Sequence, residues 1–290
     1  MAKIERRLSQ NVSGDFYVDS TCIDCDTCRW IAPEIFHQVA EQSVVYHQPR
    51  NPTERLKALQ ALLSCPTASI ATVEKPTDIQ IAQQSFPMLV DQNVFHCGYH
   101  AESSYGAASY LIQRPEGNIL IDSPRFTAPL VKQLEAMGGI HYLYLTHRDD
   151  VADHQKFHDH FGCDRILHQD DIDMSTRNVE MQLTGTEPIA LEDDLLIIPV
   201  AGHTKGHTVL LYRQKFLFSG DHLAWSTRLN RLIAFKNACW YSWTELERSM
   251  EKLAVYPFEW VLPGHGRRYH ADLETMRQSM QECLASFNLS

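Results

Sequence analysis

The alternation of apolar and polar positions along the chain predicts many short strands separated by a few amphipathic helices. Strands are expected where short apolar runs are bounded by turn residues, and a tight hairpin is expected at Gln214. The predicted strands cover residues 94–99, 108–114, 118–122, 140–145, 189–191, 195–199, 208–213, 215–219 and 260–265. The predicted helices cover 53–63, 129–137, a stretch ending at Phe161, a stretch from the capping box at Ser242 to Ala254, and 273–287.

Several of these strands end in residues that bind metals. The apolar run 140–145 stops at Thr146-His147, and acidic residues and a second histidine follow within 148–154. The runs 216–221 and 260–265 end in Asp221 and His265, and the segment 201–208, which precedes both runs, reads AGHTKGHT. Open α/β sheets bind their ligands at the carboxyl ends of the strands. Four strand ends that carry His and Asp therefore predict one polynuclear metal centre.

Composition and charge narrow the class of protein. The chain has 290 residues, of which 44% are hydrophobic and 21% charged, as in soluble globular proteins. No stretch approaches the roughly 18 apolar residues that span a bilayer, and the amino terminus lacks the apolar core of a secretion signal. The net charge of −10 argues against nucleic acid as a partner. We expect a cytoplasmic protein that acts on a small molecule, with a redox partner protein as a further candidate and no membrane partner.

The eight cysteines point to metal or redox chemistry or to simple burial, rather than to disulfides. Cys22, Cys25 and Cys28 are evenly spaced in TCIDCDTC, and Cys65-Pro66 supplies a fourth thiol. This pattern resembles the bacterial ferredoxin signature, in which a proline follows the fourth cluster ligand. Where two-cluster ferredoxins carry another Cys-Pro, this chain has Ala32-Pro33. The resemblance implies a ferredoxin-like domain with a single [4Fe–4S] cluster. A zinc site and four buried inert cysteines are the alternatives.

The cysteine motif, the two prolines at 76 and 87 and the pattern of predicted strands divide the chain into three parts. Residues 1–75 form the predicted ferredoxin-like domain. Residues 76–87, which begin with Pro76 and end with Pro87, form the predicted linker. Residues 88–290 form a larger domain, which contains all the predicted strand ends described above.

The larger domain contains five motifs in a characteristic order. They read SYLI…GNILIDSP, LTHRDDVADH, AGHTKGHT, FSGDH and VLPGHG. In this order they resemble the motifs of the metallo-β-lactamase fold. The resemblance implies an α+β chain in which a small ferredoxin-like domain is followed by a four-layer αββα sandwich. Its metals would lie at one edge of two facing sheets.

The family's site residues carry over one at a time. Asp122 matches an aspartate that supports the site, and Asp221 matches the carboxylate that bridges two metals. Asp153, one of the predicted metal ligands, would in addition hold the nucleophile and is the predicted catalytic residue. His207 is expected to support the ligands without binding metal itself. The predicted metal ligands are His147, Asp149, Asp153, His154, His203, Asp221 and His265.

The second motif departs from the family. Five residues, Arg148–Ala152, separate the first histidine from Asp153-His154 where the family has three, and the family's second histidine is absent. Asp149 or Asp150 would have to take its place. A carboxylate there favours iron or manganese relative to zinc, and it also fits a site with one metal instead of two.

These patterns support three functions. The first is a metal-dependent hydrolase of a thioester, ester or lactone, with metal-bound hydroxide as the nucleophile. The alternative is an oxidoreductase in which the [4Fe–4S] cluster exchanges electrons with an iron-containing centre in the larger domain. A non-enzymatic redox sensor with a ligand-binding module is a third reading, because the same fold serves many functions.

Overall fold

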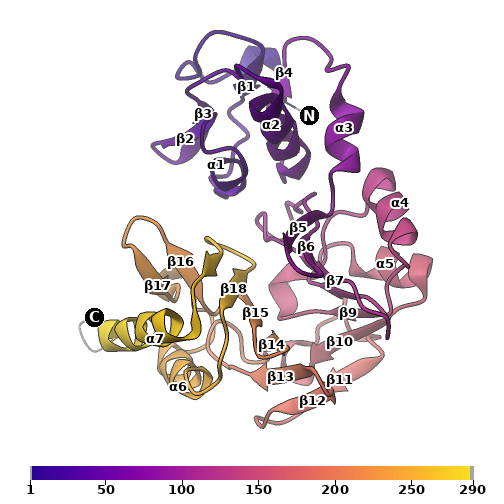
Figure 1. Ribbon diagram of the computed structural model, residues 1–290, viewed down its shortest axis with the longest axis vertical. Helices are drawn as coiled ribbons and strands as arrows, with labels where there is room; N and C mark the ends of the chain where they lie inside the picture. The colour runs from indigo at the N-terminus through magenta and orange to yellow at the C-terminus, as the bar shows by residue number, and fades with distance from the viewer. Residues whose placement is uncertain (1, 288–290) are drawn as a thin grey trace. The chain divides into compact units, whose positions relative to one another are not determined.

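The computed structural model describes residues 2–287, which form two compact units (Figure 1). The first unit consists of residues 1–141 together with 152–162. The second consists of 142–151 together with 163–290. The chain thus leaves the first unit, returns to it for one short helix, and then completes the second.

The amino-terminal part of the first unit is a small α+β assembly. Its strands pair in antiparallel fashion, β1 with β4 and β2 with β3. The strands are β1 (Phe16–Val18), β2 (Phe36–Val39), β3 (Gln42–Val45) and β4 (Ile70–Thr72), and the helices are α1 (Thr27–Ile31) and α2 (Pro52–Ser64). Helix α2 begins where the side chain of Asn51 accepts a hydrogen bond from the Glu54 amide, with Pro52 in its first turn. The amphipathic run predicted over 53–63 is therefore confirmed as a helix.

The core of this part is built partly from cysteines. Phe16, Ile35 and Phe36 are almost fully buried, and Cys28 and Cys65 belong to the same apolar cluster. A thiol buried in this way contributes to packing as a small hydrophobic group does. The cysteines therefore lie inside the hydrophobic core of this part.

The rest of the first unit is an antiparallel meander with three helices. Helix α3 (Ile79–Gln84) lies within the segment predicted as a linker, and Arg55 of α2 forms an ion pair with the neighbouring Asp78. The predicted limits at residues 75 and 88 stay a prediction. The other elements are β5 (Met88–Asp91), β6 (Val94–His96), β7 (Tyr110–Ile112), β8 (Ile119–Ile121), α4 (Ala128–Ala136) and α5 (His154–Phe161). Each of the strands β5 to β8 pairs with the next in antiparallel fashion.

The second unit contains parallel strands and a mostly antiparallel sheet. The parallel strands are β9 (Tyr142–Tyr144), β10 (Asp164–His168) and β11 (Met181–Leu183). The sheet consists of β12 (Ile189–Glu192), β13 (Leu195–Pro199), β14 (Thr208–Tyr212), β15 (Phe216–Gly220), β18 (Trp260–Pro263) and β19 (Tyr269–His270). Strands β15 and β18 run parallel, so their carboxyl ends, which precede Asp221 and His265, lie at the same edge.

Two helices and a hairpin complete the second unit. Helix α6 (Trp243–Leu253) starts at Ser242, whose hydroxyl accepts a hydrogen bond from the Glu245 amide as the capping box predicted. Helix α7 (Leu273–Phe287) has the predicted limits. The hairpin of β16 (Ala224–Ser226) and β17 (Arg231–Ile233) was not predicted, nor were β10 and β11. These missed strands are short and carry polar residues, so no apolar run marks them.

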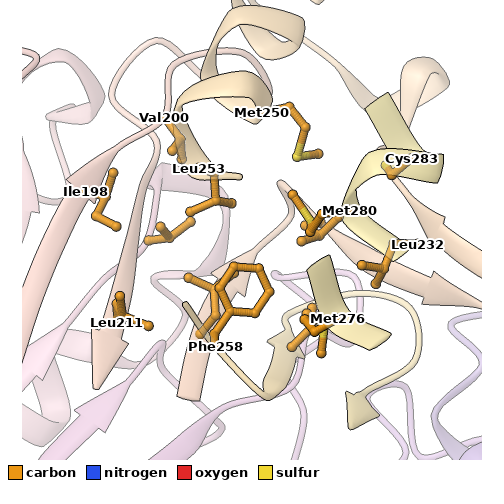
Figure 2. Packing of buried hydrophobic residues seen from close by; sticks show 14 of the residues in the cluster. Ile198, Val200, Leu211, Leu232, Met250, Leu253, Phe258, Met276, Met280 and Cys283 are labelled. Atoms are coloured by element: carbon orange, nitrogen blue, oxygen red, sulfur yellow. The ribbon is translucent and has the colours of Figure 1, made fainter. Parts of the chain in front are cut away.

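The core of the second unit lies between its helices and the sheet. Figure 2 shows the Phe258 ring among Leu253, Met276 and Met280, and all four side chains are almost fully buried. This packing holds α6, and with it the preceding chain around Ser242, against the strands that carry the predicted ligands. None of the described helices combines the length and the apolarity needed to cross a lipid bilayer.

We expect replacement of Phe258 by alanine to lower the free energy of unfolding by about 3–5 kcal/mol, because it leaves a cavity in this core. Urea denaturation followed by circular dichroism measures the change. The matched control is Val255→Ala, since Val255 is 76% exposed. Equal stability of the two variants would contradict the assigned core.

Candidate metal centres

Four cysteines of the first unit surround one small pocket. Cys22, Cys25, Cys28 and Cys65 line it together with Thr27, Ser43 and Ser69. Backbone amides point at two of the sulfurs: the Ser69 amide is 3.2 Å from Sγ of Cys65, and the Ser43 amide is 3.4 Å from Sγ of Cys22. Amide hydrogen bonds to cysteine sulfur are among the features that set the potential of iron–sulfur clusters.

The pocket disfavours free thiolates. Burial raises the pKa of Cys25 to about 11 and that of Cys28 well above its ordinary value. Burial also raises the pKa of Cys65, against the opposing effect of the Ser69 amide. Four thiols that are costly to ionise alone are stabilised as thiolates when a cation binds between them. Their number and convergence fit a tetrathiolate cluster.

A loop between β6 and β7 packs against this pocket. The Gly106 backbone has φ +86°, and a Cβ there would lie 2.8 Å from Cβ of Cys25 and 3.1 Å from its sulfur. The hydroxyl of Tyr105 donates to the carbonyl of Ile23, and Thr27 Oγ1 lies 3.1 Å from Nδ1 of His100. Only glycine satisfies both the backbone conformation and the close approach at position 106.

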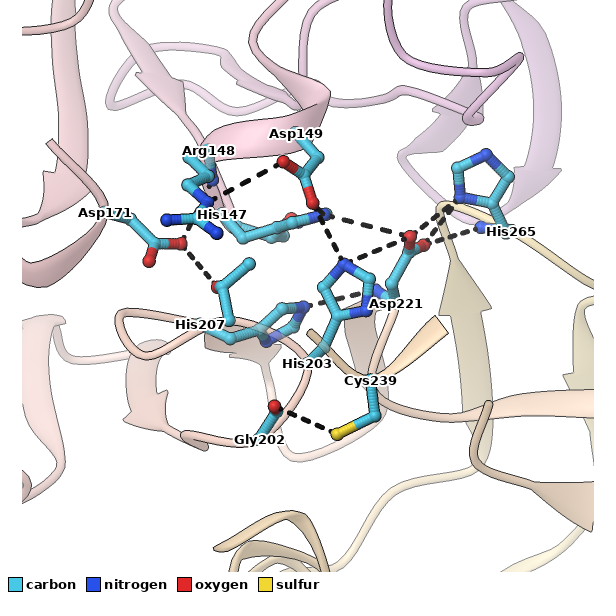
Figure 3. A network of polar contacts seen from close by, with 12 residues as sticks. His147, Arg148, Asp149, Asp171, Gly202, His203, His207, Asp221, Cys239 and His265 are labelled. Atoms are coloured by element: carbon cyan, nitrogen blue, oxygen red, sulfur yellow. Dashed lines mark hydrogen bonds and ion pairs between the residues drawn. The ribbon is translucent and has the colours of Figure 1, made fainter. Parts of the chain in front are cut away.

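The second candidate centre gathers the predicted strand ends of the second unit. His147 follows β9, His203 lies in the loop between β13 and β14, Asp221 follows β15, and His265 follows β18. Figure 3 shows these side chains and Asp149 converging on one point. The oxygen atoms of Asp221 lie at the centre of the group.

The distances between the converging atoms fit a metal ion. Oδ2 of Asp149 lies 3.3 Å from Nε2 of His203 and 3.9 Å from Nε2 of His147. Oδ2 of Asp221 lies 3.7 Å and 3.8 Å from the same two nitrogens. Ligand atoms at bond lengths of about 2.0–2.2 Å around one tetrahedral ion stand about 3.3–3.6 Å apart. The buried Nε2 of His147 has no hydrogen-bond partner in the described chain, as a metal-ligating nitrogen requires.

Neighbouring groups fix the orientation of these ligands. The hydroxyl of Thr146 is 2.9 Å from Nδ1 of His147, which directs Nε2 toward the carboxylates. The backbone amide of Asp221 donates to Nε2 of His207, and the amides of Trp240 and Tyr241 donate to the carbonyl of His203. His207 thus contacts the backbone of a predicted ligand, and its supporting role stays a prediction. Such contacts hold ligand side chains in place.

Burial and neighbouring charge set the protonation of the centre. Burial lowers the pKa of His147 to about 4, so its imidazole is neutral at pH 7. Burial alone would raise the pKa of Asp221, but the nearby His265, His147 and His203 bring it well below its ordinary value. A hydrogen bond from His203 lowers the pKa of Asp149. The centre therefore presents carboxylates beside a neutral His147, the forms that bind cations.

Both aspartates that could replace the family's second histidine reach the group. Asp149 forms a potential metal-binding set with His147 and His203, and Asp150 forms another with His147 and Asp221. Asp150 is buried, and Gly264 packs so closely that a Cβ there would lie 2.7 Å from its Oδ2. The geometry thus brings both aspartates to the group. His265 contacts Asp221 through Nδ1, at 2.8 Å from Oδ1 and 2.9 Å from Oδ2.

Three of the residues predicted for the second centre lie in the first unit. Asp153 precedes α5, its Oδ2 accepts a hydrogen bond from the Phe126 amide, and its Oδ1 pairs with Lys156. His154 begins the helix and is buried, as is Asp122 after β8. The roles of Asp153 and His154 as metal ligands, of Asp153 as the catalytic residue, and of Asp122 as a support stay predictions from the sequence.

Asp171 is a supporting residue that the sequence analysis missed. It is 1% exposed, and its carboxylate accepts hydrogen bonds from the amides of Arg148 and Gly206 and from the hydroxyl of Thr204. It therefore ties the loop after His147 to the loop that carries His203. Asp171 lies just beyond β10, and the signal that could have revealed it is the same strand-end rule that revealed His147.

The amino-terminal part matches one family model. Residues 18–72 match the 4Fe-4S single cluster domain of ferredoxin I. The cofactor of this part is thus a [4Fe–4S] cluster, as the cysteine pattern predicted. A comparison with curated proteins finds no match to the chain.

Solved structures share the fold of the larger part. VMB-1 is 18% identical, with 67% of this chain and 95% of that chain covered and a TM-score of 0.52. The metallo-β-lactamase FIM-1 from Pseudomonas aeruginosa, in its mono-zinc form, is 17% identical, with coverage of 70% and 95% and a TM-score of 0.51. A metallo-β-lactamase from Hirschia baltica is 15% identical, with coverage of 68% and 96% and a TM-score of 0.51. The predicted fold, a ferredoxin-like domain followed by a metallo-β-lactamase fold, is confirmed.

We expect Asp221→Ala to abolish metal binding at the second centre, because Asp221 lies between the histidines and offers oxygen atoms to both sets of ligands. Metal analysis and the visible absorption of the cluster are measured on the same sample. The cluster absorption should stay at the wild-type level. A variant that keeps its full complement of the second metal would refute this centre.

We expect Gly106→Ala to lower the iron and acid-labile sulfide content, because the new Cβ would collide with Cys25. The control is Gly185→Ala, since Gly185 has nearly the same φ, +85°, and no atom within 4 Å of the added Cβ. The control isolates the strain of the backbone from the collision. Equal cluster content in the two variants would mean that the close approach to Cys25 is unimportant.

Proposed function

We propose that the protein is a metal-dependent hydrolase that cleaves a thioester, ester or lactone and carries a [4Fe–4S] domain. The observation that supports the proposal most is that Nε2 of His147 and Nε2 of His203 each lie 3.3–3.9 Å from an oxygen of Asp149 and an oxygen of Asp221. A divalent cation held there would lower the pKa of a water molecule and polarise a substrate carbonyl. Cys22, Cys25, Cys28 and Cys65 would hold the cluster.

Other residues of the chain would guide the substrate to the metal and accept a proton from the attacking water. Asp149 is the accessible ligand, with 42% of its side chain exposed, whereas the His147 side chain is fully buried. Substrate would therefore approach from the side of Asp149, where Arg148 is also exposed and offers a positive charge. Asp153 would accept the proton of the attacking water. A hydrogen bond from the Phe126 amide fixes the position of its Oδ2.

The kind of metal follows from the ligands. Asp149 and Asp150 supply carboxylate oxygens where the family has a histidine, and Asp221 supplies further oxygens. Hard oxygen ligands favour iron or manganese relative to zinc, whereas the two histidines are ligands that zinc also binds. We propose iron or manganese as the native metal, with one ion at the His147, Asp149 and His203 set and the His147, Asp150 and Asp221 set as the alternative position, since His147 offers one free nitrogen.

An oxidoreductase is the second candidate, and one contact of the first unit favours it. Arg125 donates to the carbonyl of Cys65, and the next residue, Phe126, donates to Asp153. Hydrogen bonds thus connect a proposed cluster ligand to a proposed residue of the second centre. In this reading the cluster would exchange electrons with an iron-containing centre, and a redox partner protein would supply or accept them.

A panel of thioesters, esters and lactones tests the two candidates on protein purified without oxygen. We expect hydrolysis of at least one class at the same rate before and after the cluster is reduced with dithionite, because hydrolysis needs no electron. The Asp221→Ala variant should not hydrolyse the substrate, and addition of metal should not restore its hydrolysis. Absence of hydrolysis, together with oxygen uptake that requires the reduced cluster, would support the oxidoreductase instead.

A further inference from the structure

Two buried histidines of the first unit form a hydrogen-bonded pair beside the cysteine pocket. His96 ends β6 and is 0% exposed, and His100 lies in the following loop and is 1% exposed. Nε2 of His96 lies 2.8 Å from Nε2 of His100, and the two rings meet edge to face. The ring of Trp30, in α1, lies 4.9 Å and 6.0 Å from them between centroids. Buried imidazoles need hydrogen-bond partners, so these contacts fix the orientation of both rings.

The other nitrogen of His100 lies between a carbonyl and a hydroxyl. Nδ1 of His100 is 2.7 Å from the carbonyl oxygen of Gly106 and 3.1 Å from Oγ1 of Thr27, the first residue of α1. A carbonyl oxygen only accepts hydrogen bonds, so Nδ1 carries a proton and donates it to Gly106. The Thr27 hydroxyl cannot donate to a nitrogen that already carries a proton. Its hydrogen must therefore go to another acceptor.

Two acceptors lie close to the Thr27 hydroxyl. Sγ of Cys25 is 3.4 Å from Oγ1 of Thr27, and the carbonyl oxygen of Gly106 is 3.5 Å from it. The second distance exceeds the range of about 2.5–3.0 Å for O–H···O hydrogen bonds, whereas sulfur is larger and accepts at longer distance. A Cys25 that binds iron is a thiolate without a hydrogen of its own. In the cluster-bound protein the Thr27 hydroxyl is therefore the donor and Cys25 the acceptor.

The influence of Thr27 on the Cys25 thiol agrees with this direction. Burial raises the pKa of Cys25 to about 11, and the hydroxyl and the backbone amide of Thr27 oppose that rise. Both groups thus stabilise negative charge on this sulfur. Thr27 is 1% exposed, so solvent screens the interaction little.

We propose that Thr27 raises the reduction potential of the cluster through a hydrogen bond to Cys25. His100 is the positioning residue that holds the Thr27 hydroxyl in this direction, and His96 fixes the ring of His100. Reduction adds negative charge to the cluster, and a hydrogen bond to a ligand sulfur stabilises that charge. The loop after β6 therefore sets the potential together with the cysteine loops. The proposal requires only the cluster and is independent of the proposed hydrolase.

Reduction potentials test the proposal on the full chain, purified without oxygen, by dithionite titration followed by electron paramagnetic resonance. Thr27→Val removes the hydroxyl and keeps the shape of the side chain, whereas Thr27→Ser keeps the hydroxyl. The matched control is Thr72→Val, the same substitution in β4, outside the residues that line the cysteine pocket. Iron and acid-labile sulfide analysis checks that each variant holds a complete cluster.

We expect Thr27→Val to shift the cluster to a more negative potential, whereas Thr27→Ser and Thr72→Val stay near the wild type. His100→Leu removes the donor to Gly106, whose carbonyl can then accept from Thr27, so the potential should also fall. In the Thr27→Val background, His100→Leu should cause little further shift, because the hydroxyl through which it acts is already absent.

The variants separate the possible failures. An unchanged potential in Thr27→Val, or an equal shift in Thr27→Ser, would overturn the role of the hydroxyl. An unchanged potential in His100→Leu, or shifts of the two substitutions that simply add, would overturn the positioning role of His100. If Thr27→Val does not assemble a complete cluster, Thr27→Ala removes the same hydroxyl and is compared with Thr27→Ser instead. None of these results depends on a metal at the second centre, so failure of the proposed function would be seen separately.

Discussion

The second metal centre depends on one buried carboxylate. Asp221 is 7% exposed and is faced by His147, His203 and His265, whose nitrogens lie within 4 Å of its oxygens. An ionised carboxylate is costly to bury without positive partners, so the ligands and the fold around it are mutually dependent. Close packing on both sides reflects this constraint. A Cβ at Gly220 would lie 2.7 Å from Nε2 of His207, and one at Gly264 would lie 3.0 Å from Oδ1 of Asp221.

The first unit shows a similar dependence around the cysteine pocket. Residues from beyond the predicted linker, among them Tyr105, Gly106 and Arg125, contact the cysteine loops or their backbone. The ferredoxin-like part is therefore bound into the rest of this unit by close packing and hydrogen bonds. An accessory domain on a flexible tether would not require a glycine against Cys25 or a half-buried guanidinium at the Cys65 carbonyl.

The sequence predicted the second centre where chemistry and local structure coincide. His147, Asp221 and His265 each follow an apolar strand, so the strand pattern placed them at sheet edges, and their proximity followed from the fold. The supporting role of Asp171 was not predicted, because the preceding strand β10 begins with Asp164 and Arg165 and does not form an apolar run. The roles of Gly106 and Arg125 were not predicted for another reason. Each depends on contacts with residues far away in the chain, and neither residue type signals such a contact alone.

The central claim is that this chain holds two separate metal centres, one at four cysteines and one at Asp221. Anomalous X-ray diffraction from crystals of protein purified without oxygen tests it most directly, with data at the iron, manganese and zinc edges. We expect a strong iron signal between the four cysteines and a second metal signal within about 2.0–2.3 Å of the ligand atoms of His147, His203 and Asp221. A single zinc signal among the cysteines, or no signal beside Asp221, would contradict it.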